Sequence, residues 1–277
     1  MTTTKSLVAI ALLLAMAGTD AHAQTYSLRH PVPANKLRDL STDRPDRTEA
    51  PFTVDAGHYQ VEMDAINYTD DVRRGVGTRS LGIGSMNVKV GLRSNIDFQI
   101  VSELYSIDTP VGLAGGRESS SLTDVTGRLK INLWGNDGGR TAFALMPYVT
   151  TPAHVASGEK GSVTGGLIMP LGLELGYGFG MGLMSELDFV QAASGSGYRV
   201  NTIHSVTVSH DITNVVGAYA EVVAETLSEA RTRLAPTGDF GITVSPHSNL
   251  QFDIGANVGM NGNTARYTGF IGVSRRY

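Results

Sequence analysis

The sequence predicts an all-β protein: a closed antiparallel transmembrane β-barrel of about 12 strands, preceded by an extended N-terminal segment. Three observations predict this fold class. Apolar and polar residues alternate strictly in most segments from residue 58 onward. The connections between these segments alternate between short and long, as in outer-membrane barrels. An export signal precedes them, and no later apolar run reaches the roughly 20 residues of a membrane-spanning helix.

The first 23 residues predict a cleaved signal peptide. Lys5 supplies a positive charge, residues 7–17 are apolar, and Ala21 and Ala23 are the small residues that a signal peptidase reads. We therefore expect cleavage before Gln24. The apolar stretch is too short to favour a membrane anchor. The chain contains no cysteine, which excludes lipid modification at cysteine and disulfide staples.

Composition and charge narrow the class further. The formal net charge is −4 and excludes a strongly basic nucleic-acid binder. A mean hydropathy near zero suits barrel strands, in which apolar and polar residues average out. No Pro-, Gly- or Ser-rich linker divides the chain after export. We expect a signal peptide at residues 1–23, an N-terminal periplasmic or lumen-plugging segment at 24–57, and an outer-membrane barrel at 58–277.

The strands follow from the two-residue period. The first segment places Tyr59 and Val61 on one face and Gln60 and Glu62 on the other. The predicted strands span residues 58–68, 81–92, 96–105, 122–133, 141–151, 165–175, 181–190, 198–210, 215–226, 238–244, 250–260 and 265–277. An even number of strands is the rule in bacterial single-chain barrels.

The predicted connections fall into two length classes. The short ones are residues 93–95, 135–139, 176–180, 211–214 and 245–249, and the mostly longer ones are 70–79, 107–121, 152–164, 191–197 and 227–236. The turn Asn136-Asp137-Gly138 has strong turn chemistry. Short turns at one end and longer loops at the other are typical of an outer-membrane barrel.

A soluble β-sandwich has the same alternation, with its apolar face turned inward. The last strand favours the barrel, because Ile271, Val273 and Tyr277 resemble the C-terminal signal that the outer-membrane assembly machinery reads. Arg275 departs from that pattern, and an arginine at the membrane rim can snorkel to the head groups. In hydrocarbon no sheet edge can stay unpaired, so the first and last strands must meet.

Several strings resemble one bacterial family. Residues 40–51 (LSTDRPDRTEAP) and 57–62 (GHYQVE) carry the resemblance, and Thr42–Asp46 is its most specific part. Residues 122–125, 128–130, 135–139 and 259–262 match more weakly, with Thr123 in place of the usual Gly and Tyr277 in place of Phe. The chain resembles the outer-membrane family labelled "putative meta-pathway of phenol degradation". The resemblance implies a barrel linked to uptake of aromatic or other small organic compounds.

Two groups of charged residues are candidate functional sites. Asp43, Arg44, Asp46, Arg47 and Glu49 precede the first strand. They form either a plug that narrows or gates the lumen or a solvated periplasmic lead-in. The residues expected to face the lumen are Glu62, Asp64, Asp97, Glu103, Asp124, Arg128, Lys130, Glu186, Asp188, Glu221 and Asp253. These side chains act either as a selectivity surface or as ordinary wall solvation and ion pairing.

The sequence indicates no enzyme. The string His247-Ser248-Asn249 lies at a predicted turn, and His204 and Ser205 are neighbours in one strand, so their side chains point to opposite faces. The histidines show no metal-ligand spacing, and we expect neither a metal nor a cofactor. Three hypotheses remain: a channel for passive entry of small molecules, an outer-membrane hydrolase of the lipase or protease kind, and a purely structural barrel. Expected partners are outer-membrane lipids, the assembly machinery and a small-molecule solute, without nucleic acid.

Overall fold

A computed structural model describes residues 26–112, 119–121, 124–152, 162–192, 197–228 and 232–277. The predicted signal peptide and its cleavage point lie outside these residues. No helix within the described ranges is long and apolar enough to cross a membrane.

Thirteen strands and one short 3₁₀ helix make up the described chain. The helix is η1 (Ala34–Lys36), and the strands are β1 (Tyr59–Arg73), β2 (Val76–Arg93), β3 (Ile96–Val111), β4 (Ser119–Ser121), β5 (Val125–Trp134), β6 (Thr141–Thr151), β7 (Thr164–Gly176), β8 (Phe179–Gln191), β9 (Tyr198–Asp211), β10 (Val216–Leu227), β11 (Arg233–His247), β12 (Leu250–Gly259) and β13 (Tyr267–Arg276). Each predicted strand corresponds to one of them.

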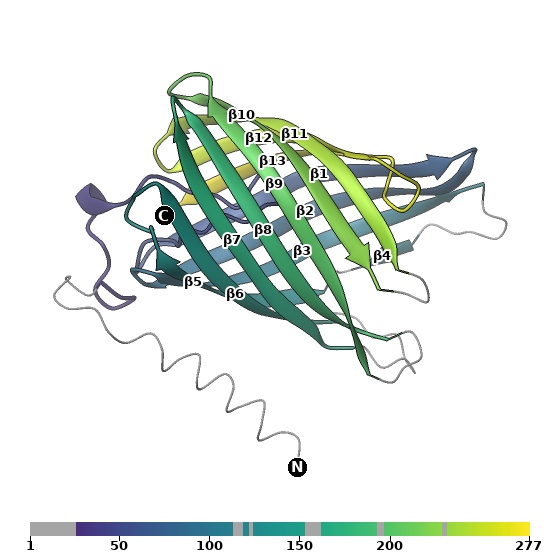
Figure 1. Ribbon diagram of the computed structural model, residues 1–277, viewed down its shortest axis with the longest axis horizontal. Helices are drawn as coiled ribbons and strands as arrows, with labels where there is room; N and C mark the ends of the chain where they lie inside the picture. The colour runs from purple at the N-terminus through teal and green to yellow at the C-terminus, as the bar shows by residue number, and fades with distance from the viewer. Residues whose placement is uncertain (1–25, 113–118, 122–123, 153–161, 193–196, 229–231) are drawn as a thin grey trace, which may run out of the picture.

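The strands close into a barrel (Figure 1). Each strand pairs antiparallel with its neighbours from β1 round to β13, β13 pairs with β1, and β2 pairs with β3. The short β4 pairs with the same strand, β3, as β5 does, so it occupies no separate place in the wall. The barrel therefore has 12 strand positions, which confirms the predicted fold class.

The two faces of the wall are opposite in character. On β12, Ile254 is 54% exposed, whereas its neighbour Asp253 is 4% exposed. The same contrast holds on β3 between Phe98, at 39%, and Asp97, at 0%. Apolar side chains thus face outward and charged side chains face inward. A soluble sandwich has the reverse arrangement, so the exposure pattern distinguishes the two fold classes that alternation alone left open.

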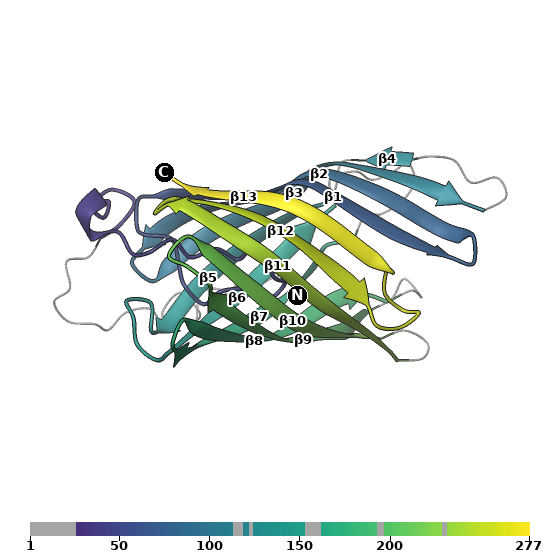
Figure 2. The same ribbon diagram turned by 90° about the horizontal axis from the view of Figure 1, so that it is seen from above.

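Several predicted connections overlap the ends of strands, most of all residues 70–79. Residues 70–79 were expected to form a longer loop, but β1 and β2 stay paired as far as Arg73 and Val76, and only Arg74 and Gly75 turn the chain. Both turn residues have positive φ, 53° and 81°. The charged residues at these strand ends looked like a loop in the sequence. Strands that project beyond the hydrocarbon need no apolar face, so they lack the apolar–polar alternation. Figure 2 shows this hairpin extending past most of the other strands.

A register irregularity crosses three neighbouring strands. Ala65 of β1, Gly84 of β2 and Leu104 of β3 are skipped in the ladders that join these strands. On β1 the outward positions are Tyr59 before this point and Ile66 after it, so the strict alternation shifts by one residue. Gly84 has a φ of +67°, which a residue with a side chain rarely adopts. The two-residue period therefore holds only piecewise.

Candidate functional site

Residues 38–55, which we call the lumen loop, enter the barrel from the end where the short turns lie. At this entrance Asp55 accepts a hydrogen bond from Arg38 at 2.8 Å and pairs with Arg276 at 3.3 Å. The ring nitrogens of His58 lie 2.8 Å from the carbonyl oxygen of Val32 and 3.0 Å from that of Tyr277. The loop is thus fastened to the last strand through Asp55, and His58, just before β1, joins the segment ahead of the loop to the end of the chain.

The returning limb of the lumen loop rests on the β5–β6 turn. The Thr53 amide donates to Asn136 Oδ1 at 3.0 Å, and Asn132 donates to the carbonyl oxygen of Pro51 at 2.9 Å. The Val54 amide donates to Asp97 at 3.0 Å. The β5–β6 turn, which the sequence predicted only as a turn, therefore also holds the lumen loop.

Asp43 lies between two buried lysines. Its carboxylate is 2.5 Å from Lys89 Nζ and 2.6 Å from Lys130 Nζ, and Lys89 also pairs with Glu62. The side chains of the two lysines are at most 2% exposed. Burial alone would raise the pKa of Asp43, but Lys130 and Lys89 hold it well below its usual range. Asp43 is therefore charged, and its negative charge balances the buried ammonium groups.

Arg44 joins β1 and β12, the two strands that flank β13 in the wall. Its guanidinium pairs with Asp64 of β1 at 2.6 Å and with Asp253 of β12 at 2.6 Å. It also lies over the ring of Phe270, 5.5 Å from the centroid. The guanidinium approaches β13 at Gly272, where an added Cβ would collide with it. The glycine is needed here for the close approach of Arg44.

The tip of the lumen loop binds a single carboxylate through its backbone. Glu221 of β10 accepts hydrogen bonds at 2.8 Å from the amides of Arg47 and Thr48, and it also contacts the Thr48 hydroxyl. The Thr48 hydroxyl lies 2.6 Å from that of Ser205 on β9. Burial, together with nearby Glu221, raises the pKa of Asp46 to about 8. Asp46 is consequently protonated at neutral pH in this arrangement.

Glu49 follows the tip and pairs with Arg128 of β5. Burial and the charge of Asp43 raise the pKa of Glu49 to about 7, although Arg128 opposes that rise. The amide of Glu49 lies 3.4 Å from the sulfur of Met184. Met184 belongs to a buried apolar cluster on the lumen side of β6–β10, made of Met146, Ile168, Met184, Ile203 and Val223. The loop thus lies against apolar as well as charged wall.

The structure brings most of the predicted residues together. All of the predicted plug residues lie in the lumen loop, and the wall residues that contact the loop directly are Glu62, Asp64, Asp97, Arg128, Lys130, Glu221 and Asp253. The others lie apart. Glu103 accepts a hydrogen bond from Asn67, Asp188 contacts the hydroxyl of Tyr148, and Glu186 is half-buried on the same strand. Asp124 is exposed just before β5.

Sequence reasoning missed several partners. Lys89 shares an inward face with buried Lys130 and could have been found from its alternation, as the other wall charges were. Thr48 and the amides of the loop tip gave no signal, because any residue except proline offers a backbone N–H group. Asp55 gave none either, because its partners, Arg38 and Arg276, lie far from it in sequence.

His204 lies next to a serine other than its sequence neighbour Ser205. Ser185 Oγ of β8 lies 3.0 Å from His204 Nδ1 of β9, and the two residues are directly opposite in the ladder. Both point to the outer face of the barrel, as do the neighbouring Phe189 and Val206. Among the described residues no carboxylate hydrogen-bonds the His204 ring, and no group of three acidic or histidine side chains could hold a metal.

Comparison with known proteins identifies one family and one fold. The family model described as "Putative MetA-pathway of phenol degradation" matches residues 42–277. An outer-membrane channel from Pseudomonas putida F1 has a TM-score of 0.60 at 10% identity, over 86% of this chain and 100% of that one. The translocator domain of the autotransporter NalP from Neisseria meningitidis (TM-score 0.45, 13% identity, 79% and 87% covered) and the CymD monoaromatic hydrocarbon channel (0.44, 10%, 79% and 87%) are more distant. No curated protein matches in sequence. At 10% identity the first of these likenesses is one of fold.

Proposed function

Because the chain belongs to the family of the MetA-pathway of phenol degradation, we propose that it is an outer-membrane channel for passive uptake of small aromatic or hydrophobic molecules. The observation that carries this proposal is the inverted barrel, with apolar side chains outside and a charged lumen inside. Such a wall is stable only when lipid surrounds it and water or protein fills it. Twelve strands enclose a narrow lumen, which favours small solutes over a general porin.

The lumen loop has a role in this proposal as a constriction. Its tip reaches Glu221 in the middle of β10, and Arg44 spans the lumen side of β1, β13 and β12. A solute on the axis must pass beside the loop or displace it. The mainly acidic wall then acts as a selectivity surface that favours neutral and cationic solutes over anions.

Location and assembly are part of the same proposal. Cleavage before Gln24 would release the chain into the periplasm, where the assembly machinery inserts barrels into the outer membrane. The exposed positions Ile271 and Tyr277 alternate along the outer face of the last strand, with half-buried Val273 between them. That apolar row is the feature the machinery would recognise.

The test is a conductance and permeation panel on the refolded chain. In planar bilayers, the intact protein is expected to show small single-channel steps, and a variant lacking residues 24–50 is expected to show larger ones. Liposome permeation with neutral, cationic and anionic solutes of matched size measures selectivity. A barrel that passes no solute in either form would refute the channel, and equal conductance of the two forms would refute the constriction.

A second candidate function rests on the Ser185–His204 pair, because a serine hydroxyl beside a histidine is the core of a nucleophile–base arrangement. The pair lies near the middle of β8, whereas lipid ester groups lie at the membrane interface. We therefore interpret Ser185 and His204 as two polar side chains that satisfy each other's hydrogen bonding on the lipid-facing surface, and not as the active site of a hydrolase. Turnover of a phospholipid by the intact protein, lost in Ser185→Ala, would reverse that preference.

A further inference from the structure

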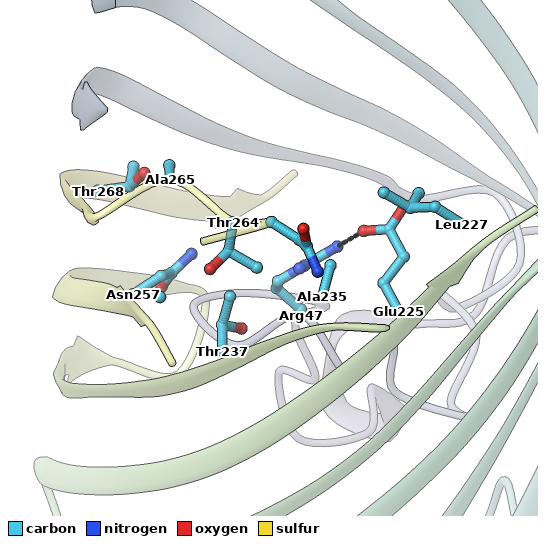
Figure 3. Close-up of a pocket in the computed structure, with 11 residues that line it drawn as sticks. Arg47, Glu225, Leu227, Ala235, Thr237, Asn257, Thr264, Ala265 and Thr268 are labelled. Carbon is cyan, nitrogen blue, oxygen red and sulfur yellow. Dashed lines mark ion pairs between the residues drawn. The ribbon is translucent and has the colours of Figure 1, made fainter. Parts of the chain in front are cut away.

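A cavity of about 310 Å³ opens on the long-loop side of the lumen loop (Figure 3). Arg47 contributes from the loop tip, and the remaining lining comes from β10 to β13 and the connection before β13. Its apolar surface includes Leu227, Ala235 and Ala265. The volume is about twice that of a ~150 Å³ cavity that holds benzene. One single-ring molecule therefore fits, with room for a substituent.

A donor and an acceptor meet at one wall of this cavity. Figure 3 shows the guanidinium of Arg47 directed at the carboxylate of Glu225, and Nη2 lies 3.9 Å from Oε2. That separation is too long for a direct hydrogen bond. It does leave space for one oxygen atom at ~2.8 Å from each group, which is normal hydrogen-bond length. The side chains of Arg47 and Glu225 are 38% and 28% exposed, so a solute can reach them.

The charges select what can bridge the gap. A carboxylate on the solute could pair with Arg47, but it is repelled by Glu225 and has no hydrogen to donate to it. An ammonium group could pair with Glu225, but it is repelled by Arg47 and has no lone pair to accept from it. A neutral hydroxyl meets both requirements, because its hydrogen is donated to Glu225 and its oxygen accepts from Arg47. The apolar side chains of the same cavity can cover a ring or a short alkyl group.

We propose that this cavity is a binding subsite for a small neutral organic compound that carries a hydroxyl group, held between Glu225 and Arg47. The inference rests on the proposed channel function, because it gives the first binding position of a solute that enters from the long-loop side. A site built around a hydroxyl discriminates strongly against the analogue that lacks it, since its polar groups are then left without a partner.

The experiment uses the mature chain refolded in detergent micelles and titrated calorimetrically with phenol, toluene and benzoate at neutral pH. Titrations into empty micelles are subtracted. Phenol is expected to bind at least tenfold more tightly than toluene or benzoate, which corresponds to about 1.4 kcal/mol. The variants Glu225→Leu and Arg47→Met are expected to remove this preference. Glu225→Gln and Arg47→Lys keep an acceptor and a donor, and should retain part of it.

Matched controls lie at the other end of the barrel. Glu174→Leu and Arg140→Met change the same residue types at exposed positions near the short turns, and both should bind phenol as the unchanged protein does. Equal affinity for phenol and toluene would overturn the subsite, as would a preference that survives in both Glu225→Leu and Arg47→Met. Failure of the channel would look different: phenol would bind with the expected preference, but no solute would cross a liposome.

Discussion

Replacing Asp43 with Asn should release the lumen loop from the barrel wall. The substitution keeps the size of the side chain but removes the charge that lies 2.6 Å from Lys130 and 2.5 Å from Lys89. Lys89 keeps its pair with Glu62, whereas Lys130, which is 0% exposed, loses the carboxylate that it contacts. Breaking a buried pair by removing one partner costs about 3–5 kcal/mol. The docked-to-released ratio of the loop should therefore fall by about two to four orders of magnitude.

Two measurements detect this release. In planar bilayers, Asp43→Asn is expected to spend more time in a high-conductance state, and trypsin should cleave after Arg47 faster than in the unchanged protein. The control is Asp211→Asn, which removes an exposed carboxylate at the β9–β10 turn that makes no ion pair or hydrogen bond with the lumen loop in the described part of the chain, and should change neither readout. Adding Lys130→Met to Asp43→Asn removes the unpaired cation and should restore part of the docking. Unchanged conductance and proteolysis in Asp43→Asn would show that the loop is not held by this charge.

Three further outcomes are expected. Asp46 has a pKa near 8 and Glu49 a pKa near 7 in the docked loop, so both bind a proton there that they lose when the loop is released. The free energy of docking should therefore weaken as pH rises from about 4 towards 8, by about 1.4 kcal/mol per proton and pH unit. Asp43 has a lowered pKa, so the stability that its charge adds to the docked loop is lost only below about pH 4 and does not change between about pH 4 and 8. Single-channel conductance should therefore rise towards alkaline pH, and this rise should shrink in Asp46→Asn. Arg44→Met leaves Asp64 and Asp253 unpaired and should open the loop at neutral pH, whereas a conductance equal to that of the unchanged protein would argue against its role. Ile254→Arg places a charge on the outer face and should lower the stability to urea in lipid vesicles by about 2–4 kcal/mol, whereas Ile254→Val should cost far less; no difference between the two would mean that this face does not meet lipid.

The candidate site was predictable in kind but not in arrangement. The alternation of residues 96–100 shows that Asp97 and Gln99 share a face, and the exposure of Phe98 agrees with it. The same reasoning predicted which wall charges face the lumen. It could not pair them with the lumen loop, because the partners are distant in sequence: Glu221 is 174 residues from Arg47. It compared His204 only with its neighbour in sequence, Ser205, and rightly rejected that pair, but it could not find Ser185, which lies opposite His204 on the adjacent strand β8.

The sequence by itself determined the strands, their order around the barrel and which face of most strands is apolar. These features depend on local periodicity and on the need of every strand edge for a partner, and both are visible in a single chain. Tertiary structure alone decided that the lumen loop lies inside, that Asp43 sits between Lys89 and Lys130, and that the alternation shifts at Gly84. The physical reason is that closing the barrel brings distant strands around one small volume. Charges that look independent along the chain must then neutralise one another there.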